Sequence, residues 1–184
     1  MDTPQKGIIL LAEPFLKENV FKRSAIIVCR HTEEGGTFGF AINKLLKTTL
    51  SEIINDLAAI DFPVYLGGPM QKDTLHFIHQ YPHFLKDAER IFEGVYWGGD
   101  FETLKKHLKN GTIHKNKIKF ILGYSGWSQG QLEEEIIEES WILTKADKNI
   151  VFETEASEIW QKSMILLGGK NKAMAYYPTD PQLN

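Results

Sequence analysis

Segment 123–137, GYSGWSQGQLEEEII, gathers residue types that could do chemistry. Ser125 lies between glycines, as the nucleophile of an α/β-hydrolase does in the pattern G-x-S-x-G. Trp127 occupies the place of the final glycine, where the backbone must pack closely, and Ser128 and Gly130 indicate another turn before any helix. We therefore expect Ser125 to be a turn serine that bonds to local backbone, not a nucleophile.

Three consecutive carboxylates follow at 133–135. Neighbouring carboxylates can serve as general acid and base when their pKa values are pushed apart. Successive helical residues point about 100° apart, however, so three of them cannot converge on one substrate atom. Acids in a first helical turn also complement the helix dipole. Of the three, Glu135, which neighbours Leu132 and Ile136, is the candidate to turn inward in a fixed polar role.

The histidines of LHFIHQYPH, His76, His79 and His83, raise the question of a metal site. Residues three apart in a strand face opposite sides, and the branched and aromatic neighbours with Pro82 favour a strand. We therefore expect exposed histidines at a strand edge, with no metal. No cofactor is expected.

Two further segments could be mistaken for binding sites. GGTFGFAINK (35–44) lacks the spacing of a phosphate-binding loop and enters a strand, which indicates a hairpin turn. HKNKIK (114–119) is the densest basic cluster, but it has no interleaved aromatic residues and no helix-turn-helix pattern. A solvated loop is expected there, and no nucleic acid is expected as a partner.

Composition sets the class of protein. The 184 residues have a net charge of −3 and are 42% hydrophobic and 24% charged, as in an ordinary globular protein. The single cysteine, Cys29, lies in the apolar run SAIIVCR, so we expect a buried thiol and a reducing compartment. The N-terminal apolar run is too short for a signal peptide, and no run is long enough to span a membrane. These features predict one cytoplasmic domain over 1–184, without a membrane.

Short apolar runs alternate irregularly with helical patterns along the chain. Strands are expected at 7–12, 24–30, 37–43, within PVYLGG, TLHFIHQ and IFEGVYWGG, at 117–126 and within WILTKA. Helices are expected after a capping box at Thr49 and Glu52, after a cap at Asp100, within QLEEEIIEES and from Thr154 to a stop at Gly168 and Gly169, and the tail YYPTDPQLN is expected to be irregular. Such an order predicts the α+β class with a mixed sheet.

Taken together, these segments resemble the YqgE/AlgH family of small bacterial proteins nearly from end to end. The resemblance rests on GIILLAEPFL, FKRSAIIV, GGTFGFAIN, LGGPM with LHFIH, GVYWGGDFETL, LGYSGWSQGQLEEEI with SW, and DPQLN. One departure is Leu45, where the family usually has a proline. The resemblance implies a branching, partly barrel-like sheet flanked by helices, and it implies little about activity.

Three functions remain open. The first is a non-enzymatic binding or regulatory module with a protein or small-molecule partner, as a monomer or a homodimer. The second is a hydrolase or transferase with a site around Glu135 and the turn at 123–131, and the third is a transcription-linked regulator. The candidate binding surface has no assigned catalytic residue and comprises Arg23, Asn43, Gly126, Trp127, Gln131 and Glu135.

Overall fold

Branched and aromatic residues dominate the strands of this protein, as their packing on a pleated surface favours. A computed structural model describes residues 3–58 and 60–178. Its strands are β1 (Ile8–Ala12), β2 (Ala25–Thr32), β3 (Gly36–Ala41), β4 (Leu45–Thr49), β5 (Pro63–Leu66), β6 (Met70–His79), β7 (Glu89–Phe92), β8 (Val95–Trp97), β9 (Ile118–Trp127) and β10 (Trp141–Lys145). Its helices are α1 (Leu50–Ile53), α2 (Phe101–Lys109), α3 (Gln131–Ile137), α4 (Ala156–Leu167) and α5 (Gly169–Met174), with shorter turns η1 (Asn55–Leu57), η2 (Lys115–Lys117) and η3 (Asn149–Glu153).

The strands form one branching sheet. Its main path runs β10-β1-β2-β3-β9-β6-β8-β7, and every pair on this path is antiparallel. The sheet branches at β9, which also pairs with β5 in parallel, and β5 pairs with β4. The expected α+β class with a mixed, branching sheet is therefore confirmed.

The sheet curls without closing, so that its end strand β7 returns to the side of β2. Glu89 on β7 accepts a hydrogen bond from Arg30 of β2 at 2.9 Å and another from Lys6 at 2.7 Å. These ion pairs join β7 to β2 through side chains. The curled part, β2-β3-β9-β6-β8-β7, thus resembles a barrel with one seam made by side chains.

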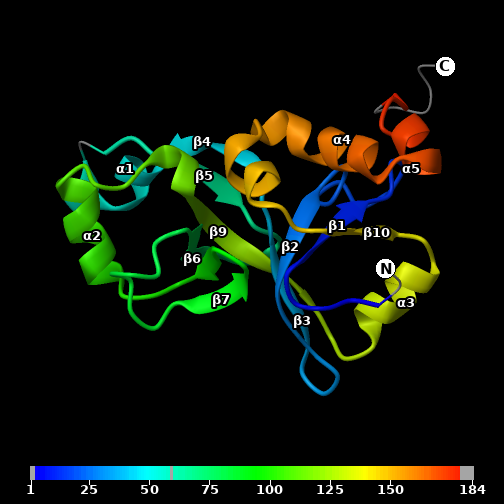
Figure 1. Ribbon diagram of the computed structural model, residues 1–184, viewed down its shortest axis with the longest axis horizontal. Coiled ribbons are helices and arrows are strands. Elements are labelled where there is room, and N and C mark those ends of the chain that lie inside the picture. Colours follow the sequence, from blue (N-terminus) through cyan, green and yellow to red (C-terminus); the bar gives the residue numbers. More distant parts are fainter. Residues whose placement is uncertain (1–2, 59, 179–184) are drawn as a thin grey trace.

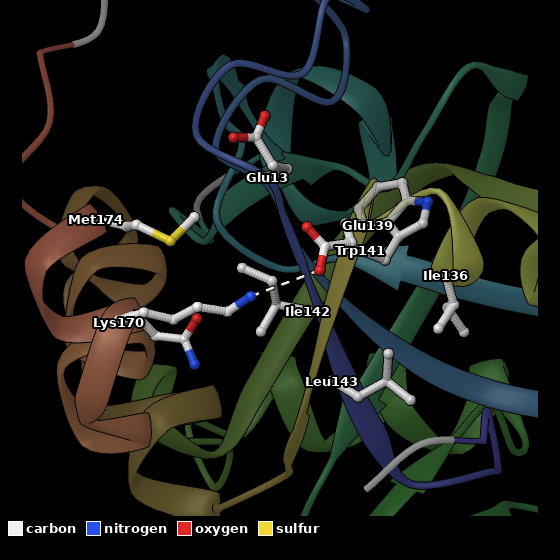
Figure 2. A pocket seen from close by; sticks show the side chains of 9 residues that line it. Glu13, Ile136, Glu139, Trp141, Ile142, Leu143, Lys170 and Met174 are labelled. Carbon is white, nitrogen blue, oxygen red and sulfur yellow. Dashed lines mark ion pairs between the residues drawn. The ribbon is translucent and has the colours of Figure 1, made fainter.

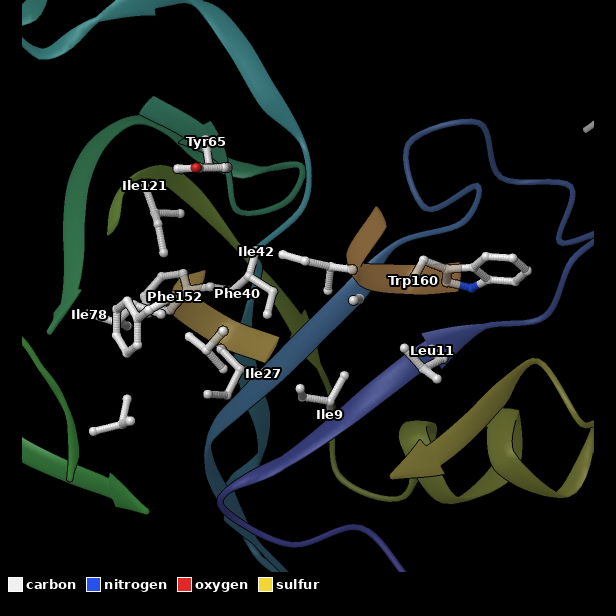
Figure 3. Close-up of a cluster of buried hydrophobic side chains, with 14 of the residues drawn as sticks. Ile9, Leu11, Ile27, Phe40, Ile42, Tyr65, Ile78, Ile121, Phe152 and Trp160 are labelled. Atoms are coloured by element: carbon white, nitrogen blue, oxygen red, sulfur yellow. The ribbon is translucent and has the colours of Figure 1, made fainter. Parts of the chain in front are cut away.

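Three clusters of buried apolar side chains fill the fold. The largest lies inside the curled sheet and beneath α4 (Figure 3), and it includes Ile27, Phe40, Ile121 and Trp160. Trp160 is held by a hydrogen bond from its Nε1 to the carbonyl oxygen of Ala12 at 2.9 Å. A second cluster includes residues of α1 and α2, and the third includes residues of β1, β2 and α3. Figure 1 shows α1 and α2 at one end of the molecule and α3 at the other.

Local sequence signals predicted where two helices begin. Thr49 and Glu52 form the expected capping box of α1, and the Asp100 carboxylate accepts the backbone N–H of Glu102 at the start of α2. None of the helices within 3–58 and 60–178 has the length and apolar character that crossing a bilayer requires.

Several expected boundaries were wrong. IFEGVYWGG is a hairpin of β7 and β8, because Gly94 takes a φ of +76° and reverses the chain. Strand β4 and helix α5 were not expected, whereas the helix after Thr154 ends at Leu167, before Gly168 and Gly169, as expected. Of the tail that was expected to be irregular, residues 179–184 lie outside the described residues.

Gly123 and Gly126 do not form a tight corner between a strand and a helix. β9 continues through both glycines to Trp127, and the turn follows at 128–130. Gly130 supplies the left-handed residue, with a φ of +76°, that ends this turn before α3. Gly123 and Gly126 therefore both lie within the strand.

Candidate functional site

Trp127 and Trp141 are tied to α3 by one carboxylate. Both indole Nε1 atoms donate to Oε2 of Glu135, each at 2.7 Å. Trp127 is only 6% exposed, and Glu135, the candidate for an inward polar role, accepts from both indoles. The carboxylate is fully engaged, since its Oε1 accepts from Gln131 Nε2 at 2.8 Å.

Gln131 extends this network to the turn after β9. Its Oε1 accepts the backbone N–H of Ser128 at 3.0 Å. The network therefore fixes the end of β9 relative to α3. Beside it lies a hollow of about 360 Å³, lined by Trp127, Gln131 and Glu135 together with Phe21 and Trp141.

Ser125 lies within β9 and is fully buried. Its Oγ donates to the carbonyl oxygen of Gly67 at 2.9 Å, so the serine bonds to backbone, but to a residue just after β5, 58 residues away in sequence, and not to a local turn. This long-range bond corrects the expectation of a turn serine. The LGGPM motif is explained at the same place, because a Cβ at Gly68 would lie 2.3 Å from the carbonyl oxygen of Tyr124.

Arg23 and Asn43 form a separate group. The Asn43 side chain accepts from the backbone N–H of Ala25 at 2.9 Å and donates to the carbonyl oxygen of Arg23 at 2.8 Å. The Arg23 guanidinium lies 4.8 Å from the ring centre of Trp160 and donates to the carbonyl oxygen of Tyr177. Gly126, Trp127, Gln131 and Glu135 are thus brought together, and Arg23 and Asn43 bond to other groups.

A pocket that the sequence did not predict opens at one end of the curled sheet. Four consecutive strands, β3, β9, β6 and β8, each contribute one ring: Phe38, Tyr124, His76 and Trp97. Phe38 lies 4.9 Å from Trp97 and 5.1 Å from Tyr124 between ring centres, and His76 lies 6.3 Å from both. We call this hollow of about 500 Å³ the aromatic pocket.

Two glycines of β9, Gly123 and Gly126, shape this pocket. Gly123 has a φ of +67° and interrupts the alternation of side chains along β9. Consequently Tyr124, three residues after Ile121, packs on the same core as Ile121. Gly126 pairs with Phe38 across β3 and β9 and lines the pocket without a side chain, which leaves room beside the rings.

The polar groups of the aromatic pocket are few. His76 Nε2 is buried and has no hydrogen-bond partner in the described part of the chain. Burial lowers the pKa of His76 below its usual 6.5, so the imidazole is neutral at pH 7. Arg30 lies at the rim, with its guanidinium 5.6 Å from the ring centre of Trp97.

The expectation of exposed strand-edge histidines was wrong for His79. The expected strand does separate the two side chains, because His76 packs among the rings of Phe38 and Phe40 whereas His79 packs against Phe77 on the other face. His79 is fully buried, and its ring nitrogens bond to backbone. Among residues 3–58 and 60–178, no three His, Cys, Asp or Glu side chains are grouped as a metal site would need.

Two other sequence expectations have mixed outcomes. Cys29 is buried as expected, and desolvation raises the pKa of its thiol. Lys119, the last residue of the basic cluster, is not solvated but 4% exposed within β9. Its Nζ lies 3.9 Å from the ring centre of Tyr65, and desolvation lowers the pKa of Lys119 to about 8.

A smaller hollow of about 300 Å³ lies along β10 (Figure 2). Lys170 of α5 reaches across it to Glu139, with 3.5 Å between Nζ and Oε1. Both side chains are at least 74% exposed, and ion pairs of this kind contribute little to stability. This hollow lacks the ring cluster and the buried polar atom that distinguish the aromatic pocket.

The described geometry has relatives of known structure. The fold is similar to that of a protein from Corynebacterium diphtheriae, with a TM-score of 0.79 and 18% identity over 95% of this chain and 93% of that one. It is also similar to the solution structure of the AlgH protein from Pseudomonas aeruginosa, with a TM-score of 0.72 and 23% identity over 97% of each chain. At these identities the likeness concerns the fold alone.

Sequence relatives cover nearly the whole chain. A UPF0301 protein from Chlorobium limicola is 39% identical over 183 residues, or 100% of this chain and 97% of its own length. A UPF0301 protein from Cytophaga hutchinsonii is 38% identical over 180 residues, or 97% of this chain and 98% of its own length. The family model described as AlgH-like matches residues 9–172. The expected resemblance is therefore confirmed, and the chain belongs to the YqgE/AlgH family.

Proposed function

We propose that this protein is a non-enzymatic, cytoplasmic binding or regulatory module, and that it holds a small ligand in the aromatic pocket. The observation that carries the proposal is the hollow of about 500 Å³ that the rings of Phe38, Trp97 and Tyr124 border. Stacked and edge-to-face contacts with these rings would stabilise a small ligand there.

Shape and position support the same function. Ligand sites are concave, mostly apolar, about 300–1,000 Å³ in volume, and common in the mouths of β-barrels. The aromatic pocket, at about 500 Å³, lies on β3, β9, β6 and β8 of the barrel-like sheet, and its aromatic rings stand beside the polar side chains of Arg30, Thr37 and Ser128. Its rings come from four neighbouring strands, which hold them more firmly than loops would.

Part of the binding surface expected from the sequence supports this pocket from behind. Gly126, Trp127 and Ser128 line it. Gln131 and Glu135 then hold Ser128 and Trp127 in place through hydrogen bonds. We propose that these residues shape the ligand site, with Gly126 facing the ligand directly.

The alternative of a hydrolase or transferase has less support. Glu135 spends its oxygens on two indoles and one amide, and Ser125 is buried with its hydroxyl on a backbone carbonyl. Ser125 is therefore closed to a substrate, and Glu135, which borders the hollow of about 360 Å³, already accepts hydrogen bonds on both of its oxygens. A role in transcription finds no particular support either, because the net charge is −3 and Lys119 of the basic cluster is buried.

The test is a fragment screen by NMR that follows the indole N–H signals of the four tryptophans. Trp97→Phe assigns the Trp97 signal by its disappearance. We expect some fragments to shift the Trp97 signal. The signal of Trp160, a buried residue of α4, should stay unchanged. A broad library that never moves Trp97 would rule out a small-molecule site in the aromatic pocket.

A further inference from the structure

We infer that the ligand of the aromatic pocket is a flat aromatic ring that carries an anionic group. This inference rests on the proposed function and adds the chemical class of the ligand. Two features of the pocket determine it: the ring surfaces and the charge of Arg30.

The ring surfaces favour a flat ligand. Phe38, Trp97 and Tyr124 lie within 5.1 Å of one another through Phe38, tilted by 49° and 63°, so their faces and edges border one open space. Aromatic pairs gain from stacked or edge-to-face contacts beyond the area that they bury. An aliphatic ligand would bury area here but would gain none of these contacts.

The charge of Arg30 excludes a cation and favours an anion. Aromatic cages elsewhere bind quaternary ammonium groups, but Arg30 already places a positive charge over Trp97. Arg30 is the one Lys, Arg, Asp or Glu side chain among the residues described as lining the pocket. Its bond to Glu89 uses one N–H of the five that a guanidinium has, and its side chain is 57% exposed. Carboxylate and phosphate are the groups that a guanidinium fork matches.

The experiment uses three probes of similar size: naphthoate, naphthylmethylammonium and decalin carboxylate. The first has the ring and the anion, the second has the ring with a cation, and the third has the anion without an aromatic ring. Each is titrated against the full chain while the Trp97 indole signal is followed. We expect naphthoate to bind at least about tenfold more tightly than either of the others, a difference of about 1.4 kcal/mol.

Variants then assign the polar contact. Arg30→Gln should weaken naphthoate about tenfold and should narrow its advantage over naphthylmethylammonium. Arg90→Gln is the matched control, because Arg90 is exposed on β7 and does not line the pocket, and it should change nothing.

The outcomes separate the two proposals. Equal or tighter binding of naphthylmethylammonium or decalin carboxylate at Trp97 would overturn the aromatic anion and leave the pocket as a ligand site. The same holds if Arg30→Gln and Arg90→Gln weaken naphthoate equally. If none of the three probes moves Trp97 but other fragments do, the ligand class is wrong; if nothing moves it, the proposed function is wrong as well.

Discussion

Trp127 at the end of β9 and Trp141 at the start of β10 donate their indole N–H groups to the same oxygen of Glu135, each at 2.7 Å. The two rings meet edge to face, 5.6 Å apart between centres and at 83°. One helix residue thereby links two strands that are not neighbours in the sheet. The spacing W-x7-E-x5-W in the sequence encodes this link.

Glu135→Gln should lower the free energy of unfolding by about 1–3 kcal/mol, because hydrogen bonds to a charged group contribute about 1.5–3 kcal/mol each and the amide weakens them. The variant also turns an N–H₂ group toward Gln131 or toward the indoles. Glu134→Gln, an exposed neighbour on the same helix, is the control and should stay within about 0.5 kcal/mol of wild type. Denaturant titration compares the three proteins. Equal stability of all three would show that the shared carboxylate contributes nothing.

Ser125→Ala should cost about 0.5–1.5 kcal/mol and should not affect ligand binding. The loss is small because the carbonyl oxygen of Gly67 also accepts the backbone N–H of Ala41 at 2.9 Å and so keeps a partner. Chemical denaturation measures the cost, and the naphthoate titration measures binding. Loss of binding with an intact fold would place Ser125 in the ligand site.

Local patterns predicted most of the elements of the fold and some of its contacts. The capping box at Thr49, the cap at Asp100 and the buried Trp127 each follow from residues close together in the sequence. The boundaries that were wrong involve glycines, since Gly94 reverses the chain whereas Gly123 stays within a strand, and both have similar φ. The difference lies in what pairs with each strand, which no local pattern records.

The aromatic pocket could not be predicted for the same reason. Phe38, His76, Trp97 and Tyr124 each look like an ordinary strand residue. In the sequence they are spread over positions 38–124. Only the order β3-β9-β6-β8 brings them together. From the sequence, His76 is only a candidate metal ligand. The structure places its side chain among the rings of Phe38, Trp97 and Tyr124.

His79 should be neutral, with its proton on Nε2. That nitrogen lies 2.8 Å from the carbonyl oxygen of Gly98 and must donate, whereas Nδ1 accepts the backbone N–H of Tyr81 at 3.0 Å. Burial lowers the pKa of His79, and the Gly98 bond opposes this only in part. Because the unfolded chain takes up the proton first, stability should fall as pH drops below about 6.5.

Ring nitrogen chemical shifts in NMR report the tautomer and charge of His79, and denaturant titration at pH 7 and at lower pH reports the stability. A His79 signal that shows the Nδ1–H tautomer, or that is fully charged at pH 6.5, would contradict the assignment.

Lys119→Met should raise the free energy of unfolding at pH 7 by about 1–3 kcal/mol, because a charged amine is costly in a site that lowers its pKa to about 8. The contact with the Tyr65 ring offsets part of that cost. Between pH 8 and about 10 the folded wild type holds Lys119 neutral while the unfolded chain still binds the proton, so wild type gains stability as pH rises. The advantage of Lys119→Met should therefore shrink over this range. Thermal unfolding of wild type and variant at pH 7 and at about pH 10 measures this advantage. A variant less stable than wild type at pH 7 would mean that the buried amine makes a net favourable contact.

The central claim is that the aromatic pocket holds a small ligand, and Gly126→Val tests it most directly. Gly126 is exposed, its backbone has no strained φ, and an added Cβ meets only the Tyr124 ring, at 3.2 Å, so valine fills the pocket within a strand that accepts it. Wild type, Gly126→Val and the Arg90→Gln control are each equilibrated with a bacterial metabolite extract, and the retained small molecules are identified by mass spectrometry. We predict a compound retained by wild type and by Arg90→Gln and lost from a fully folded Gly126→Val. Equal retention by all three proteins, or no retained compound on wild type, would contradict the claim.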